Sequence, residues 1–592
     1  MQIYKFRNCF LNTTERRVIK DGEHLDLTPR DIDVLLLLIE SSGEIVTKDE
    51  MLGKVWNGSF VEEGNLPVHI SRLRRSLRAG STEHYIETVQ GTGYRFVAPV
   101  ETVTTEEWSQ HISSLVRVGT GNGSDRNCLA SIAILPLQNE SGDEEIEYLA
   151  DGFTESLING LSRQPELKVL ARNTVFRYKN KDHDAKEIGE TLGVSTVLIG
   201  RINLAGDNLL VSVELVQVDD GTQVWGDQFN RPFSEIIKIQ DEITSAVKLE
   251  LSSKFKHGES DNRSDGFTQN SESYKFYLKG KYFFEKHSEA DIYKAIELFQ
   301  KSIAFDPTNI HSYVETAECY LLLYNYDYIL RTDSLAKIEP LLQLTSETGQ
   351  TTDVFHCLVG GIKMYLEWKF EESEKGLRQA LKLNPNNLLA HYRYAKLLMY
   401  TGRFPESLVV LNDMMRIDPL SVLTYKYIGR SFYCMGRYEN AIMYIQEVLE
   451  LEPTDHEALF LLGVVLTEQG KFDEAILMLG KAIDIQPTPE RLSMIGYAYA
   501  LKGENDKARQ IIAEIKAQSK NEDSTAWKLA KIYLALGEKD MTYAMLDTAF
   551  QEHEVDLIGL GCFPWWKSIR HEPRFKKLMR KVGLPISPHS VK

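Results

Sequence analysis

The chain has 592 residues, a formal net charge of −17, and 43% hydrophobic residues. This length predicts several domains, and the acidic balance excludes a protein that is basic over its whole surface. The six cysteines show no CxxC spacing, which argues against a zinc site or a disulfide framework and fits a reducing cytosol. Without a signal peptide or a run of 18 apolar residues, we expect a cytoplasmic protein that does not contact a membrane.

The first hundred residues predict short strands, then helices, then a β-hairpin. Apolar residues up to about residue 26 favour paired strands. A helix begins after Thr28, a suitable N-cap, with Pro29 in its first turn. A second helix follows Thr47 and ends near Trp56. After a third helix, two β-prone runs joined through Gly91-Thr92-Gly93 predict a hairpin.

The third helix, residues 65–78, is amphipathic. Its apolar face is formed by four leucine and isoleucine residues, namely Leu66, Ile70, Leu73 and Leu77. The residues that point the other way are Val68, Ser71, Arg72 and Arg75. From Arg72 to Arg95 the sequence holds five arginines against two acidic residues. A local basic patch on an acidic chain favours contact with phosphates at this one place.

Four segments together resemble the OmpR/PhoB-type winged helix in order and spacing: LTPRD (27–31), IVTKDEML (45–52), VHISRLRRSL (68–77) and IETVQGTGYRFV (86–97). The resemblance implies that residues 65–78 enter the major groove of double-stranded DNA and that the hairpin 88–95 lies at the minor groove. The contact positions that it implies are Val68, His69, Ser71, Arg72, Arg74, Arg75, Thr88 and Tyr94. We add Asn65, Arg78 and Arg95, which lie at the ends of the same helix and hairpin, to the expected DNA-binding residues.

Within this set we expect different roles. Arg72 and Arg75 are the candidates for base edges or adjacent phosphates, assisted by His69 and Ser71. The candidates for phosphate contacts are Arg74, Arg78, Thr88 and Tyr94. Arg95 is expected at the minor groove or the backbone. Because a single winged domain binds weakly, we expect a dimer on repeated half-sites.

The middle of the chain changes character. Strand-like runs such as 129–137 and 209–218 alternate with helical runs such as 148–161 and 233–251, which predicts an α/β sandwich. The segments AILPLQNESGD, YLADGFTESLINGLS and GTQVWGDQFNR are similar to the TolB amino-terminal-like domain. That resemblance implies a sensing or assembly role and no reaction.

The last part of the chain repeats itself. Four prolines lie 34 residues apart: Pro385, Pro419, Pro453 and Pro487. Gly402, Gly436 and Gly470 keep the same period, as do Gly429 and Gly463. A 34-residue period with small residues at these places is the tetratricopeptide signature, so we expect an all-α solenoid that binds protein partners. The aromatic pair Trp565-Trp566 is expected to anchor a cap at its end.

The predicted organisation is a multidomain chain. It consists of a winged helix-turn-helix domain of α+β class (1–100), a linker (101–127), the TolB-like α/β domain (128–255), a second linker (256–272), a tetratricopeptide-repeat solenoid (273–560) and a C-terminal cap (561–592). The layout also resembles HilA-like activators. Since no receiver-like segment precedes the winged domain, we expect the middle and repeat regions to control it.

No catalytic motif, cofactor loop or cluster of metal ligands is evident, so we expect no enzyme, no cofactor and no metal site. The acids Asp151, Glu155 and Asp227 are interpreted as solvated or capping carboxylates. The first functional hypothesis is a sequence-specific transcriptional regulator, more an activator than a repressor. The alternative is a repeat scaffold whose winged domain binds protein, because Gly64 and Gln90 stand where many relatives have Arg.

Overall fold

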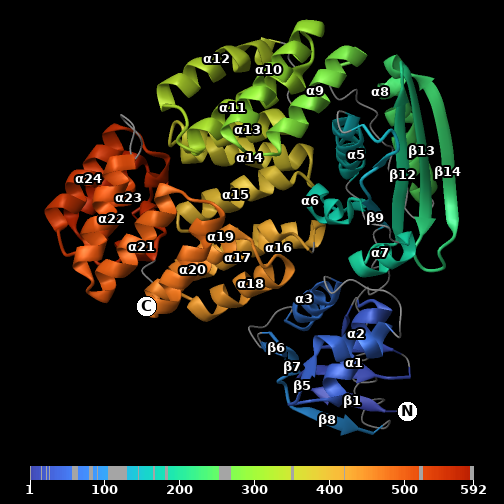
Figure 1. Cartoon of the computed structure of the whole chain (residues 1–592), viewed down its shortest axis with the longest axis horizontal. Coiled ribbons are helices and arrows are strands. Elements are labelled where there is room, and N and C mark those ends of the chain that lie inside the picture. The colour runs from blue at the N-terminus through green and yellow to red at the C-terminus, as the bar shows by residue number, and fades with distance from the viewer. Residues whose placement is uncertain are drawn as a thin grey trace, which may run out of the picture.

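A computed structural model describes residues 2–14, 16–21, 23–25, 27–56, 65–78, 84–89, 91–104, 130–143, 146–164, 167–180, 184–252, 268–347, 352–418, 420–518 and 525–586. Three parts follow one another along the chain (Figure 1). A small N-terminal domain, drawn in blue, lies below a sheet-containing middle domain. The remaining helices curve from α9 beside the middle domain round to α24.

The N-terminal domain, hereafter the winged domain, contains two antiparallel sheets. The five-stranded sheet has the order β4-β3-β2-β1-β8, with strands β1 (Ile3–Phe6), β2 (Cys9–Asn12), β3 (Arg17–Lys20), β4 (Glu23–His24) and β8 (Val100–Val103). The three-stranded sheet has the order β5-β7-β6, with strands β5 (Ile45–Thr47), β6 (Ile86–Val89) and β7 (Gly93–Phe96). Strands β6 and β7 form the hairpin, or wing.

The helices of the winged domain are α1 (Pro29–Glu40), α2 (Lys48–Trp56) and α3 (Asn65–Arg78). Helix α1 begins with a capping box, in which Thr28 accepts from the backbone of Asp31 and the Asp31 carboxylate accepts from the backbone of Thr28. The apolar face of α3 lies in the core of the domain, since its four leucine and isoleucine residues are fully buried. The predicted helices therefore form where the caps and the periodicity place them.

Both predicted linkers differ from the structure, and residues 271–272 of the second one already belong to α9 (Ser271–Phe284). Residues 101–103 were expected in a linker, but they belong to β8, which pairs with β1 and completes the five-stranded sheet. The unpaired backbone edge of β1 is the physical reason, because a neighbouring strand satisfies its hydrogen-bonding groups. Residues 105–127 of that linker lie outside the described residues.

The middle domain is a mixed sheet covered by helices. Its sheet order is β11-β9-β12-β13-β14, with β10 beside β12. The strands are β9 (Ala130–Ile134), β10 (Gln138–Asn139), β11 (Leu167–Val169), β12 (Thr196–Ala205), β13 (Asn208–Gln217) and β14 (Gln223–Pro232). The helices are α5 (Glu147–Ser162), α6 (Arg172–Val175), η2 (Phe176–Tyr178), α7 (Ala185–Leu192), η3 (Phe233–Glu235) and α8 (Ile236–Ser252). This is the predicted α/β arrangement.

The helices from α9 to α24 pair as successive hairpins, and we call this region the solenoid. Its first helices of each pair are α9 (Ser271–Phe284), α11 (Ile310–Asn325), α13 (Asp353–Tyr365), α15 (Leu388–Tyr400), α17 (Val422–Cys434), α19 (His456–Glu468), α21 (Pro489–Lys502) and α23 (Ala526–Ala535). The second helices are α10 (Glu289–Phe305), α12 (Arg331–Glu347), α14 (Phe370–Leu383), α16 (Phe404–Ile417), α18 (Tyr438–Leu451), α20 (Phe472–Ile485), α22 (Asn505–Gln518) and α24 (Lys539–Gln551).

The repeated glycines have the two roles that the period predicts. Gly436, in the turn between α17 and α18, has a φ of 71°, a left-handed conformation that a glycine adopts without strain. At Gly463 in α19 an added Cβ would lie 2.6 Å from a carbon of Leu479 in α20. The two paired helices can approach each other closely here because glycine has no side chain.

The end of the chain packs against the solenoid itself. It contains η4 (Val555–Gly561), η5 (Pro564–Trp566) and α25 (Pro573–Val582). Trp565 and Trp566 are buried, and the Trp565 ring lies beside Tyr433 of α17 and Tyr497 of α21. His553 stacks on Trp368, with ring centroids 3.5 Å apart. The chain's own C-terminal segment therefore covers inner surfaces of several repeats.

Candidate nucleic-acid interface

The candidate interface is built on α3 and the wing. Asp31, at the start of α1, joins α1 to α3. Its carboxylate lies 2.8 Å from Nδ1 of His69 and accepts from Nη1 of Arg72 at 2.9 Å. All three side chains are buried. Burial alone would raise the pKa of Asp31, but Arg72 and His69 hold that pKa below the usual range of a carboxyl group.

Arg74 joins α3 to the wing. Its Nε donates to the backbone oxygen of Ile86 at 3.1 Å, and its Nη2 donates to the hydroxyl of Thr88 at 2.6 Å. Its guanidinium also lies over the ring of Tyr94, 5.9 Å from the ring centroid. Burial of the Tyr94 hydroxyl, with Glu450 nearby, raises the pKa of Tyr94. Helix and wing are thus held as one surface.

A helix of the solenoid lies against this surface. Arg74 forms an ion pair of 3.0 Å with Glu450 of α18, and the Thr88 hydroxyl donates to the same carboxylate. Arg78 forms an ion pair of 2.5 Å with Glu447 of α18. The hydroxyl of Ser71 lies 3.0 Å from that of Tyr425 in α17 and donates to Glu447 at 3.4 Å. We call this set of seven residues the α3–α18 contact.

The middle domain also touches α3. Val68 is buried in the apolar cluster of the middle domain. Nη1 of Arg72 lies 3.4 Å from the backbone oxygen of Glu190, near the end of α7. Helix α3 thus lies between α7 and α18, as Figure 1 shows. Sequence periodicity directed Val68 and Arg72 away from the core of the winged domain, but the middle domain covers Val68, and Arg72 binds both Asp31 and Glu190.

The predicted DNA-binding residues fall into three groups. Those with buried side chains are Val68, His69, Ser71, Arg72, Arg74, Arg78 and Tyr94. Those with half-buried side chains are Arg75, Thr88 and Arg95. Asn65 is the first residue of α3, and its side chain is not among those described. Arg95 lies 3.5 Å from Glu87 in the neighbouring wing strand.

Sequence reasoning did not single out four residues that the structure places at this surface. Asp31 lies within the LTPRD segment, and its position three residues after Thr28 is the signal for a capping box. Tyr425, Glu447 and Glu450 carry no such signal, because acidic and aromatic residues are common on repeat helices and most are solvated.

Other acids that sequence analysis considered are structural. Asp151 accepts from Nζ of Lys179 at 2.6 Å. Glu155 lies between Arg172 and Lys281, 3.4 Å from each. Asp227 is exposed on β14. Over the described ranges, no three His, Cys, Asp or Glu side chains gather in a way that could hold a metal ion.

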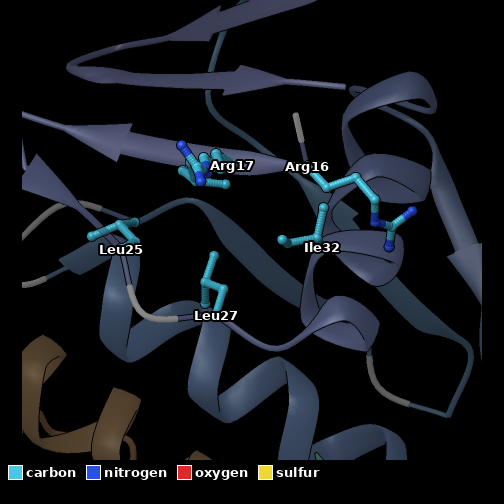
Figure 2. Close-up of a pocket in the computed structure, with 6 residues that line it drawn as sticks. Arg16, Arg17, Leu25, Leu27 and Ile32 are labelled. Atoms are coloured by element: carbon cyan, nitrogen blue, oxygen red, sulfur yellow. The ribbon is translucent and has the colours of Figure 1, made fainter. Parts of the chain in front are cut away.

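A shallow hollow of about 320 Å³ lies elsewhere on the winged domain (Figure 2). It is lined by the residue before β3 and by residues of β3, of α1 and of the segment between them: Arg16, Arg17, Val18, Leu25, Leu27 and Ile32. The Arg16 guanidinium is already bound to Asp33 and to the backbone oxygen of Pro29. No residue of α3 or of the wing lines this hollow, so it is separate from the candidate interface.

Comparison with known families defines the class of protein. Residues 22–96 match the family described as transcriptional regulatory protein, C terminal. Residues 126–246 match the HilA/YgeH-like transcriptional regulator, second domain, and the TolB-like resemblance is not confirmed by this match. Residues 435–496 and 466–532 match tetratricopeptide repeats. The chain therefore has an OmpR/PhoB-type domain, a HilA-like domain and tetratricopeptide repeats, the arrangement of a transcriptional regulator.

Two individual relatives agree with this class, and a third has the name of an enzyme. The chain is 23% identical to the transcriptional regulator HilA of Salmonella typhimurium over 407 residues, which are 67% of this chain and 68% of that protein. It is 36% identical to the transcriptional activator CadC of Escherichia coli over 93 residues, 15% and 18% of the two chains. It is 30% identical to a putative adenylate cyclase 3 of Rhizobium meliloti over 177 residues, only 30% of each chain.

Among solved structures, the DNA-binding domain of CadC from Escherichia coli is 30% identical, with a TM-score of 0.17. That likeness covers 17% of this chain and 98% of the CadC domain.

The regulator families point to a non-enzymatic protein. None of the helices in the described part of the chain has the length and apolar character needed to cross a membrane.

Proposed function

We propose that this chain is a sequence-specific DNA-binding transcriptional regulator of the cytoplasm, acting as an activator and binding DNA as a dimer. One observation carries the proposal: the segment that matches the regulator family contains α3 and the wing, joined by Arg74 into one arginine-rich surface. Helix α3 is the element that enters the major groove, where every base pair can be distinguished.

The structure suggests a refined division of roles on α3. Because Arg72 and His69 bind the buried Asp31, we assign them to positioning α3 against α1 and not to base contact. Ser71 and Arg75 are then the candidates for base edges, whereas Arg74, Arg78 and Thr88 are candidates for phosphates. Arg95 and Tyr94 support the wing. The middle domain and the solenoid bind protein partners or a ligand.

The test begins with selection from a pool of random-sequence duplexes at low salt. The full chain is used beside a full chain with Glu447→Gln and Glu450→Gln, which removes the carboxylates that pair with Arg78 and Arg74. With a selected duplex, Arg75→Ala is expected to weaken binding by about 1–3 kcal/mol, and only for that sequence. Arg78→Ala is expected to weaken all duplexes and to reduce the salt slope by about one.

The matched control is Arg201→Ala, which removes an exposed arginine of β12 that pairs with Glu140, far from α3 in the sequence. It should leave binding and its salt slope unchanged. Enrichment of no duplex by either chain would refute the proposal.

The scaffold alternative has one supporting observation, because two arginines of α3 form ion pairs with carboxylates of the solenoid. A chain that shows no affinity for any duplex, but keeps its contact with the solenoid, would favour the alternative.

A further inference from the structure

Two carboxylates of one solenoid helix meet the arginines that the proposed function assigns to DNA phosphates. Glu447 and Glu450 are three residues apart on α18 and therefore share one face of that helix. Glu447 pairs with Arg78 and Glu450 with Arg74, and both also accept from hydroxyl groups, those of Ser71 and Thr88. Paired oxygens that accept from arginine and hydroxyl donors are also what a phosphate backbone presents.

Burial makes this contact exclusive. Arg74 and Arg78 are only 5% and 7% exposed, and Glu447 is 2% exposed. A duplex cannot reach the face of α3 while α18 covers it, because the same guanidinium groups would need two partners at once. The arrangement described here is therefore incompatible with α3 in a major groove.

The acidic pair is particular to this repeat. The residues one period earlier on α16 are Asp413 and Arg416, which pair with each other. The residues one period later on α20 are Lys481 and Asp484. Each neighbouring repeat thus offers one acid and one base at these places, whereas α18 offers two acids. The pair of acidic residues therefore occurs on the helix that contacts the winged domain.

The chemistry of the α3–α18 contact suits an equilibrium between a state in which α18 covers α3 and a state in which the two helices are apart. The seven residues of the α3–α18 contact are all polar or aromatic with a hydroxyl, and buried ion pairs add little net stability once desolvation is counted. By contrast, the middle domain is joined to the solenoid by separate bonds, such as those from Thr174 to Asp418 at 2.7 Å and from Arg177 to Glu452 at 2.9 Å. Separation of α18 from α3 therefore leaves that junction intact, and full departure of the winged domain would also break the contacts of Val68 and Arg72 with the middle domain.

We propose that the structure is a DNA-excluding state, in which Glu447 and Glu450 of the solenoid occupy the DNA-contact surface of α3 in place of phosphates. The inference rests on the proposed function and names its regulation. A partner or ligand that binds the solenoid or the middle domain and separates α18 from α3 would switch DNA binding on. By reciprocity, DNA would favour release of α18 to the same extent.

The test compares three full-length chains by fluorescence anisotropy with a labelled random-sequence duplex at low salt. Glu447→Gln with Glu450→Gln removes both acids of α18 while keeping their shape. Glu474→Gln with Asp484→Asn is the matched control, because it removes two exposed acids of α20 and changes the net charge equally. The first double variant is expected to bind roughly 5- to 150-fold more tightly than the unaltered chain. The control is expected to change affinity by less than about twofold, since solvent and salt screen distant exposed charges.

A second variant and a second readout guard against misfolding. Tyr425→Phe removes only the hydroxyl that meets Ser71, so it should raise affinity in the same direction by a smaller factor. Hydrogen exchange of the α3 amides should be faster in the Glu447/Glu450 double variant than in the unaltered chain, even without DNA.

The outcomes separate the two proposals. Equal and tight DNA binding by all three chains would overturn the inference and leave the proposed function intact. An equal gain in the α20 control would also overturn it, because net charge would explain the gain. Faster exchange of α3 with no DNA binding by any chain would overturn both.

Discussion

The substitution Asp31→Asn tests the junction on which the arrangement of α3 depends. Asp31 is 0% exposed and binds Arg72 and His69 of α3 while capping α1. Asparagine has nearly the same shape and can still accept from the backbone, so the main loss is the negative charge. The guanidinium of Arg72 would then be buried without its counter-ion.

The size of the effect follows from which partner is removed. Removing one member of a buried pair typically costs about 3–5 kcal/mol, because the remaining charge stays desolvated. Loss of the capping contribution would add at most about 1 kcal/mol. Arg72→Met should cost less, since the Asp31 carboxylate keeps His69 and Thr28. The double variant should cost less than the sum of the two single variants, because the unpaired charge disappears.

The dependence of stability on pH gives an independent test of the direction of this effect. The pKa of Asp31 in the folded chain lies below its ordinary value of about 4. This carboxylate therefore contributes stability at pH values above its ordinary pKa, and the contribution is lost as the pH falls through the lower folded value. Asp31→Asn should remove this acid-dependent part of the stability of the winged domain.

The assay is hydrogen exchange of α1 and α3 amides in the full chain, since it reports the free energy of opening of this domain alone. The control is Asp33→Asn, which removes an acid of the same helix that pairs with Arg16 near the surface. A loss below about 1 kcal/mol for Asp31→Asn, or strict additivity with Arg72→Met, would refute the reasoning.

Two predictions concern the solenoid and its C-terminal segment. Gly463→Ala should destabilise the chain by about 1–3 kcal/mol, because the new Cβ would lie 2.6 Å from Leu479. Gly480→Ala in the facing helix is the control and should stabilise by about 0.5–1 kcal/mol, since open space surrounds it; calorimetry that ranks them in the opposite order would contradict this account. Burial, with Arg331 nearby, lowers the pKa of His553 to about 4, so its packing on Trp368 should weaken as the pH falls from 6.5. His553→Phe should remove roughly 1–2 kcal/mol of this acid sensitivity, a value reduced for partial exposure, and identical pH profiles of thermal unfolding would count against it.

Local patterns were sufficient to predict most elements. Thr28 and Pro29 mark the start of α1, four leucine and isoleucine residues define α3, and the wing follows from its glycines. In the solenoid the 34-residue period of prolines and glycines predicted helix pairs from α15 to α20. These features depend on residues close together in the chain, where propensity and periodicity act.

The interval between Ile310 and Asn384 departs from the 34-residue period, and the structure shows why. Helix α12 has 17 residues and contains Pro340, and α13 begins only at Asp353. The two helix pairs are present, but a longer helix and a longer connection carry the additional residues.

Sequence alone therefore determined the kinds of domain, the helix that carries the arginines, and the resemblance to DNA-binding regulators. Only the tertiary structure decided what those arginines contact. Arg72 forms an ion pair with Asp31. Arg74 and Arg78 form ion pairs with Glu450 and Glu447, which are over 300 residues away in the chain. The partner of a buried charge is set by proximity in space and not by proximity in the sequence. From the sequence, two acidic residues on a repeat helix are expected to be solvated, and only the folded chain places the winged domain against them.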